Sequence, residues 1–503
     1  MIDKNNAVTI TLAIAVIAVA IAIAFAATAP TKQVNEATLK VSWDMLQNPE
    51  QASSDKPNAV EVTVYQSQAQ DYYQPFTQMK MQYNQQAGIG LVKEVRTAEL
   101  SGGASLLKLK NTAAYIDATS VTFKDLTDQG TQLLEQNYDY DLINDQKLLQ
   151  KYVDKTISVR TANQTISGTL LSSTGGTLVL QTATGITSLG NYDQINYPAL
   201  PEGLITTPTL TWLLANTQAG KHDFEVTYLT SGLDWTANYV ATTNADDTSM
   251  QLRGWVSVTN DAGTTFENAQ LKLVAGDVNL VQNQAVPAPR MYAETMAVGA
   301  ADSKSFAQEQ LFEYHLYTLE RPTTLANGQV KQINFFNAEN VKVEKQFVFE
   351  PSSSSKVQVK LNFENKKSQG LGLPLPKGKV RMYKPDSSGQ LQFLGEDQID
   401  HTAENESLKL AVGNTFDVVA ERTQTDNRQR GSCAQENSYT VKVRNHKTEA
   451  IKVVVVENVW GDVTILRESA SHKKESTYKY SWEVPVPAGG TTEHTYTIEQ
   501  RWC

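Results

Sequence analysis

The sequence predicts an all-β fold: mainly antiparallel β-sandwich domains plus a small barrel-like unit, with an N-terminal transmembrane helix and one short helix. Three observations lead to this prediction. Short runs rich in Val, Tyr, Trp and Thr recur between Gly, Asn, Asp and Ser, which is typical of strands joined by tight turns. Residues 156–195 repeat this pattern at small scale, with glycines between the runs. An uncharged apolar stretch precedes all of them.

The composition limits the functions that the chain can have. A length of 503 residues allows about three domains at roughly 150 residues each. Only 19% of the residues are charged, below the usual value of about 25%, and Thr, Gln, Asn and Ser replace them. The net charge is −10, and the longest basic runs are the pairs 366–367 and 473–474. A nucleic-acid-binding protein needs a basic patch, so we expect no nucleic-acid partner.

The first 30 residues predict a membrane segment. Residues 5–31 contain no charged side chain, and the run at residues 7–29, which mixes Ala with Ile and Val, is longer than the roughly 20 residues that cross a bilayer. Lys4 before this run favours a cytoplasmic N-terminus. A retained signal anchor and a signal cleaved near residues 24–29 both remain open, as does a buried soluble helix. With either signal, the rest of the chain lies outside the cytoplasm, in the periplasm or at the cell surface.

The remaining chain divides into five expected parts. After the anchor we expect a polar spacer, an N-terminal β-rich region with a short helix near residues 142–152, and then a small barrel resembling the SH3 or Sm type. A central β-sandwich region follows, and a polar break at residues 424–432 precedes a last sandwich of the immunoglobulin-like type. The expected bounds are 1–30 for the anchor, 31–57, 58–147, 148–200, 201–423 and 424–503.

The central region contains the clearest strand pattern. Its three strongest runs are residues 223–229, 235–242 and 252–259, each bounded by turn residues. In the last of them, alternation places Trp255 on a different face from Val256 and Val258. The sequence therefore predicts a half-buried antiparallel sheet here.

Cys433 and Cys503 are the two cysteines of the chain, and they flank the last expected domain. An even number of cysteines in an exported chain predicts a disulfide. Two free thiols, or pairing between molecules through the terminal Cys503, remain alternatives.

The chain has weak candidates for chemistry. Glu396, Asp397, Asp400 and His401 form a short acidic cluster with an imidazole, which can bind a divalent ion or act as acid and base. Acidic residues near turns also simply accept hydrogen bonds from the backbone, so the cluster has a structural interpretation as well. His315 joins the list as a more distant partner. Motifs for a nucleophilic serine or a phosphate-binding loop are missing from the sequence, and we expect no cofactor.

Two further motifs concern modification. Asn163-Gln164-Thr165 and Asn405-Glu406-Ser407 match the acceptor pattern for N-glycosylation. The pattern predicts surface positions for Asn163 and Asn405 if the host glycosylates the chain.

Several separate blocks of the sequence match one known family. They are residues 134–138, 141–142, 197–198, 208–212, 228–235, 269–278, 313–317, 380–383 and 395–397. Through these blocks, residues 116–422 resemble the mucoidy-inhibitor-A-like family, a bacterial and archaeal family of β-rich domains. The resemblance implies an exported, mostly β protein without established catalytic residues, so no site residue carries over. Many relatives have a coiled-coil segment before the β domain, whereas this chain has a short Gln- and Tyr-rich stretch at residues 66–88.

The sequence thus favours a non-enzymatic, membrane-anchored extracytoplasmic protein of the cell envelope, acting as a surface scaffold, assembly or adhesion module. We expect it to contact the membrane through its N-terminal helix and a protein partner, or its own copies, through β-sheet edges. The alternative is an envelope hydrolase or metal-dependent enzyme built on Glu396, Asp397, Asp400 and His401. The enzyme class requires His315, His401 and two of these carboxylates to converge in a cleft, within reach of a common metal ion.

Overall fold

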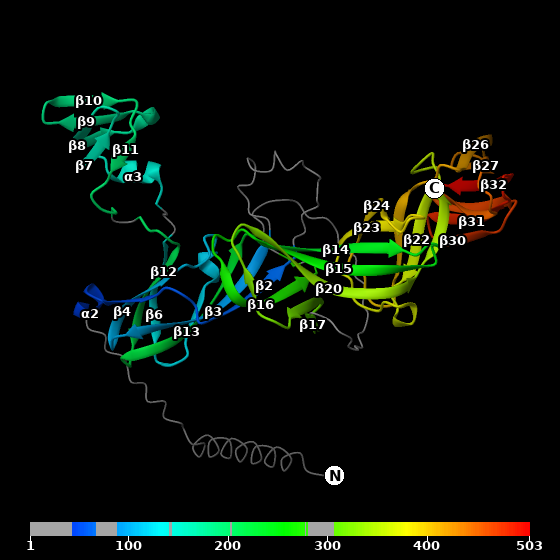
Figure 1. Ribbon diagram of the computed structural model, residues 1–503. Coiled ribbons are helices and arrows are strands. Elements are labelled where there is room, and N and C mark those ends of the chain that lie inside the picture. Colours follow the sequence, from blue (N-terminus) through cyan, green and yellow to red (C-terminus); the bar gives the residue numbers. More distant parts are fainter. Residues whose placement is uncertain (1–42, 67–87, 140–142, 202–203, 277, 280–305) are drawn as a thin grey trace, which may run out of the picture.

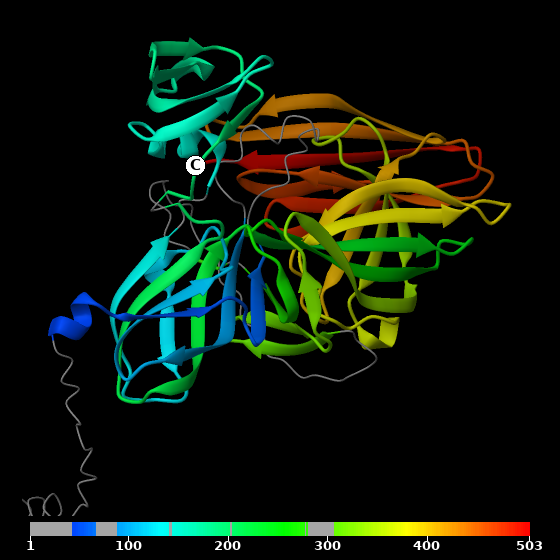
Figure 2. The same ribbon diagram turned by 60° about the vertical axis from the view of Figure 1, so that its left-hand side comes forward.

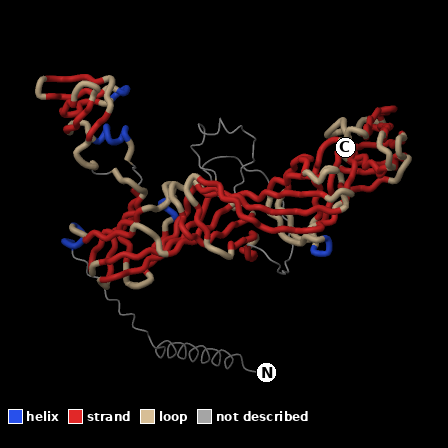
Figure 3. The backbone as a smooth tube through the Cα atoms, viewed as in Figure 1, coloured by secondary structure: helices blue, strands red, loops and turns tan. Residues whose placement is uncertain are grey.

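A computed structural model describes residues 43–66, 88–139, 143–201, 204–276, 278–279 and 306–503 (Figure 1). Strands dominate these residues, and the helices are short (Figure 3), which confirms the all-β prediction. The helical elements are α2 (Trp43–Gln47), α3 (Asp145–Lys151) and the 3-10 turns η2 (Ala118–Ser120), η3 (Thr174–Gly176) and η4 (Lys367–Gln369). No helix within the described ranges is long and apolar enough to cross a membrane, and the predicted anchor at residues 1–30 lies outside them.

Two sheets form the N-terminal part of the body. Sheet I has the order β1-β4-β12-β6, and sheet II has the order β17-β18-β16-β2-β3-β13-β5 with β19 added beside β16. The strands of sheet I are β1 (Glu50–Ser54), β4 (Gly103–Lys110), β6 (Gln132–Asp139) and β12 (Thr209–Asn216). Those of sheet II are β2 (Ala59–Tyr65), β3 (Ile89–Leu100), β5 (Thr122–Asp125), β13 (Gly220–Ser231), β16 (Phe266–Ala275), β17 (Phe306–Leu311), β18 (Tyr314–Leu319) and β19 (Thr323–Leu325).

A buried ion pair joins these two sheets. Arg96 of β3 is fully buried, and its Nε donates to Glu94 at 2.6 Å. Its Nη1 donates to the carbonyl oxygens of Ser54 and Lys110 at 3.2 and 2.7 Å, which ties sheet II to two strands of sheet I. The hydroxyl of Tyr228 donates to the other oxygen of Glu94 at 2.8 Å. Every charge in this cluster therefore has a partner, as a buried charge requires.

The chain changes sheets at Gly232. β13 belongs to sheet II, whereas β14 (Leu233–Thr243) begins sheet IV, so the predicted antiparallel sheet over residues 223–259 is divided between two sheets. Gly232 has φ of +85°, and a Cβ there would lie 2.7 Å from the carbonyl oxygen of Asp261. Only glycine fits this sharp turn.

Sheet IV has the order β20-β15-β14-β23-β24. In β15, Trp255 is half-buried and both Val256 and Val258 are buried, so the predicted alternation is confirmed. The indole Nε1 of Trp235 donates to the carbonyl oxygen of Val274 at 3.2 Å and links sheet IV to sheet II. The other strands of sheet IV are β15 (Ser249–Asn260), β20 (Gln329–Lys342), β23 (Gly378–Pro385) and β24 (Leu391–Ile399).

The small unit, α3 through β11, has its own core and stands apart from the body in Figure 1. Its sheet III has the order β10-β9-β8-β7-β11, and its edge strands β10 and β11 do not pair. The predicted closed barrel is therefore wrong, because these short strands leave both edges of the described sheet open. The strands are β7 (Thr156–Arg160), β8 (Thr165–Ser172), β9 (Leu178–Thr182), β10 (Gly185–Leu189) and β11 (Gln194–Asn196).

Sheets V and VI pack face to face at the C-terminal end (Figure 2), where Trp482 stacks on Tyr496 with ring centroids 4.6 Å apart. Sheet V has the order β25-β22-β21-β28-β31-β30, and sheet VI has the order β26-β27-β32-β29. Their strands are β21 (Glu344–Phe349), β22 (Gln358–Glu364), β25 (Ser407–Asn414), β26 (Val418–Gln429), β27 (Ala434–Asn445), β28 (Ile451–Asn458), β29 (Asp462–Glu468), β30 (His472–Ser476), β31 (Lys479–Val486) and β32 (Thr491–Arg501).

The expected break at residues 424–432 is largely strand. β26 continues to Gln429 and pairs with β27 along its length. Sheet V also takes β21, β22 and β25 from before residue 424, so this sandwich begins earlier in the chain than the sequence predicts. β26 is an edge strand, and its end is exposed to solvent. An exposed edge strand can be as polar as a loop, which is why the sequence indicated a break here.

Candidate functional site

The predicted acidic cluster does not converge. Glu396 lies 3.5 Å from the Nζ of Lys379 and 3.5 Å from the Nε of Arg381, both on the neighbouring strand β23. The Oδ2 of Asp397 accepts from the backbone nitrogen of Ala411 in β25 at 2.6 Å. Adjacent residues of a strand face opposite sides, so the two carboxylates have separate partners. Asp397 connects sheet IV to sheet V.

The other members of the cluster also have separate roles. The carbonyl oxygen of Asp400 accepts from the hydroxyl of Thr402 at 2.8 Å. The Nδ1 of His401 accepts from the backbone nitrogen of Lys377 at 3.2 Å. His315 lies in β18, where its Nδ1 is 3.1 Å from the Nε2 of Gln308, and burial lowers its pKa. In the described part of the chain, no group of three or more His, Cys, Asp or Glu could hold a metal ion. The described residues therefore lack the convergent ligand set that the metal hypothesis requires.

The two cysteines lie together as predicted. Cys433 and Cys503 are at disulfide distance, with Cα atoms 5.6 Å apart. The backbone nitrogen of Trp502 donates to the carbonyl oxygen of Cys433 at 3.1 Å, next to the pairing of β27 with β32. The bond thus joins the ends of two strands that already pair.

Both predicted glycosylation positions are accessible. Asn163 is exposed in the turn between β7 and β8, and Asn405 is exposed in the turn before β25 with φ of +73°. Glycosylation of either residue stays a prediction.

A buried acid–imidazole pair was not predicted from the sequence. His222 of β13 is 1% exposed; its Nδ1 is 2.7 Å from the Oδ2 of Asp125, and its Nε2 is 3.2 Å from the carbonyl oxygen of Gln218. Burial by itself would raise the pKa of Asp125. Hydrogen bonds from the backbone of Asp128 and from the side chains of Thr131 and His222 hold it below its usual value. The pair fixes a loop at the end of sheet II. No local sequence motif marks it, because Asp125 and His222 are far apart in the chain.

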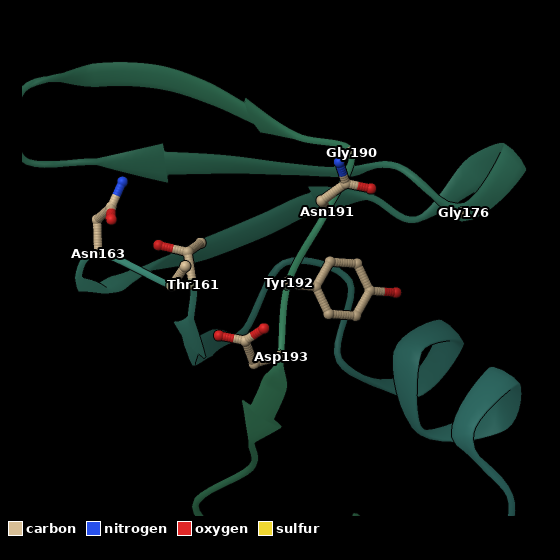
Figure 4. Close-up of a pocket in the computed structure, with 8 residues that line it drawn as sticks. Thr161, Asn163, Gly176, Gly190, Asn191, Tyr192 and Asp193 are labelled. Carbon is tan, nitrogen blue, oxygen red and sulfur yellow. The ribbon is translucent and has the colours of Figure 1, made fainter.

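The small unit contains a cavity of about 380 Å³ (Figure 4). Three chain segments line it: the turn after β7, the loop at η3, and the chain leading into β11. The turn is closed by the backbone nitrogen of Thr161 donating to Gln164 at 2.8 Å, and the backbone nitrogen of Asp193 donates to Arg160 at 2.8 Å. The lining residues are Thr161, Ala162, Asn163, Gly176, Gly190, Asn191, Tyr192 and Asp193.

Polar, mostly uncharged groups make up the wall of this cavity. Asp193 is its one charged residue, and neither Lys nor Arg contributes to the lining. The ring of Tyr192 packs on the core of the small unit, and in Figure 4 it lies on the side of the Gly176 loop. No local motif in the sequence marks this cavity, because three separate segments form its wall.

A second candidate surface is the outer edge of sheet IV. The first four residues of β24, 391–394, are called the β24 edge below. They have β23 on one side and no paired strand on the other among the described strands. Leu391, Phe393 and Leu394 are 59%, 57% and 39% exposed. The end of β24 is covered by β25 through the hydrogen bond of Asp397, so the open part is the β24 edge alone.

Comparison with known proteins identifies a family and no activity. A search of curated proteins finds no match to the chain. The family model described as "Domain of unknown function (DUF4139)" matches residues 224–503, which is more than half of the chain and includes sheets IV, V and VI. The chain therefore belongs to the DUF4139 family, a family of domains of unknown function.

Proposed function

We propose that the protein is a non-enzymatic, membrane-anchored scaffold of the cell envelope that assembles through an open sheet edge, within the mucoidy-inhibitor-A-like branch of β-rich proteins. The proposal rests on the β24 edge, whose outer side is unpaired among the described strands and which exposes apolar side chains. An unpaired strand offers backbone donors and acceptors to another chain, and exposed side chains on alternate positions add apolar contact.

The β24 edge carries no charged side chain, and the register of β24 with β23 shifts at Leu394. Exposed charges on an edge strand oppose pairing with another chain. β30, the edge of sheet V, is exposed throughout and includes Lys473 and Lys474. No charged residue occurs between Leu391 and Leu394. The contrast supports association at the β24 edge and solvation at β30.

The hairpin before the β24 edge is held firmly. Asp386 accepts from the backbone nitrogens of Ser388 and Gln390 at 2.9 and 3.0 Å, and its Oδ2 accepts from Gln392 at 2.8 Å. Phe393 packs against Tyr383 of β23 with ring centroids 5.6 Å apart. Figure 2 shows this hairpin, in yellow, reaching the outer limit of the body. A rigid, accessible edge loses little conformational entropy when it pairs.

Two further observations support location outside the cytoplasm. The uncharged run at residues 7–29 is long enough to span a bilayer. The cysteines at disulfide distance fit an oxidising compartment. Protease added to intact, accessible cells should separate the β domains from the membrane; full protection of the β domains would contradict this location.

The assembly is tested on the native protein extracted from membranes. We expect light scattering to show a discrete assembly, and the double variant Leu391→Lys/Phe393→Lys to run at monomer mass. Two cations on an edge strand oppose its pairing with another chain. The control is Val330→Lys, which places one lysine at a 61% exposed residue on β20, the opposite edge of sheet IV, and is compared also with the single variant Phe393→Lys. A monomeric native protein, or an assembly that the double variant leaves intact, would reject the proposal.

A further inference from the structure

The cavity of the small unit has open hydrogen-bonding groups. Within the described residues, the side chains of Asn163, Asn191, Tyr192 and Asp193 have no hydrogen-bond partner in the protein. Together they offer two amide groups, a carboxylate and a phenol hydroxyl, which provide both donors and acceptors. Thr161 differs, because its hydroxyl is already bonded to the carbonyl oxygen of Gln164 at 3.0 Å.

The lining excludes several ligand classes. Phosphates and other anions need cationic side chains or a cluster of backbone donors, and here the single charge is the carboxylate of Asp193. A tightly bound divalent cation needs several oxygen ligands, and Asp193 is the one carboxylate in the wall. An apolar ligand needs a mostly hydrophobic pocket, whereas amide and hydroxyl groups dominate this one.

The remaining class is a neutral molecule with many hydroxyl groups. Each sugar hydroxyl both donates and accepts, so Asp193 can accept from one while the amides of Asn163 and Asn191 bond to others. The ring of Tyr192 points away from Asp193 in Figure 4, and it supplies apolar surface on the side of the Gly176 loop. The cavity volume of about 380 Å³ is near the lower limit of ligand pockets, which span about 300–1,000 Å³.

We propose that this cavity is a binding site for one or two residues of a neutral carbohydrate. The site lies in the small unit, and the proposal does not depend on assembly at the β24 edge. The proposal also predicts an effect of glycosylation at Asn163. Because Asn163 lines the cavity, a glycan attached to it would compete with a free sugar for the site.

The test uses the full-length protein in detergent and saturation-transfer NMR with glucose, galactose, mannose and N-acetylglucosamine, each supplied as the free sugar. We expect transfer to at least one of them. Asp193→Asn should weaken that binding by about tenfold or more, because a hydrogen bond to a charged group is replaced by one to a neutral amide. Asn191→Ala should weaken it as well.

The matched control is Asp154→Asn, which makes the same change at an exposed residue of the small unit that does not line the cavity. Asp154 has φ of +65°, a conformation that asparagine also accepts. This variant should bind as the native protein does. Absence of transfer to all four sugars, equal binding by Asp193→Asn and native protein, or equal loss in Asp154→Asn would each overturn the proposal.

Discussion

Removal of the Cys433–Cys503 bond should destabilise the C-terminal sandwich and leave the N-terminal sheets unchanged. The two cysteines are 70 residues apart in sequence, so the bond closes a long loop in the unfolded chain. The chain-entropy relation gives about 4.4 kcal/mol for a loop of this length. This is an upper value, because residual structure in the unfolded chain reduces the entropy that the bond removes.

Hydrogen exchange followed by mass spectrometry measures this loss strand by strand. In the double variant Cys433→Ser/Cys503→Ser, the free energy of opening for β27 and β32 should fall by a few kcal/mol, up to about 4.4. Peptides from β3 and β13 serve as the internal control and should exchange at native rates, since their core is separate from that of the C-terminal sandwich. Unchanged exchange in β27 and β32 would refute the reasoning, as would equal acceleration in all four strands.

Three further outcomes follow from the buried contacts. Arg96→Met should cost about 3–5 kcal/mol by leaving Glu94 buried and unpaired, and adding Glu94→Gln should restore part of that loss in urea denaturation. The pKa of Asp125 is lowered in the folded protein, so the ionised carboxylate stabilises the fold. This stabilisation is complete above the usual pKa of 3.8 and is lost as the pH falls through the lower folded pKa. The variant Asp125→Asn should therefore make the free energy of unfolding less dependent on pH in that acid range. Gly378→Val should cost about 1–3 kcal/mol or more, because its Cβ would lie 2.2 Å from a carbonyl oxygen of β14, whereas Gly413→Ala meets no neighbour and should leave the melting temperature unchanged.

Local patterns in the sequence predict most of the strands. The runs at residues 223–229, 235–242 and 252–259 lie within β13, β14 and β15, and the helix expected near residues 142–152 is α3. The alternation of apolar and polar residues and the turn residues each involve only a few neighbouring positions, so a single segment is enough to predict a strand. Asn144 caps α3 by accepting from the backbone nitrogen of Lys147 at 2.9 Å, which is also a local signal.

Pairing between distant strands was not predictable. β2 pairs in parallel with β16, and β14 pairs in parallel with β23, across long separations in the chain. Sheet V likewise combines β21 with β28 across the position where the sequence indicated a domain boundary. These pairings depend on which strands, distant in sequence, pack next to one another. The periodicity of one segment does not show which other segment will be its partner.

The candidate sites show the same limit. Glu396, Asp397, Asp400 and His401 are neighbours in sequence, but Glu396 and Asp397 alternate along β24 and have partners on different strands, and Asp400 and His401 follow the end of that strand. The cavity of the small unit, in contrast, is built from three segments that only the fold of sheet III brings together. Paired cysteines were predictable because the pairing of two cysteines needs no knowledge of the intervening fold.

Crosslinking in intact cells tests the central claim, assembly of an exported protein through the β24 edge, most directly. A photoreactive side chain placed at Phe393 should yield a covalent adduct of higher mass on illumination, and the same side chain at Val330 should not. Both positions are well exposed, at 57% and 61%, so accessibility does not explain a difference between them. An adduct at Phe393 alone is the predicted result. No adduct at Phe393, or equal adducts at both positions, would contradict the account.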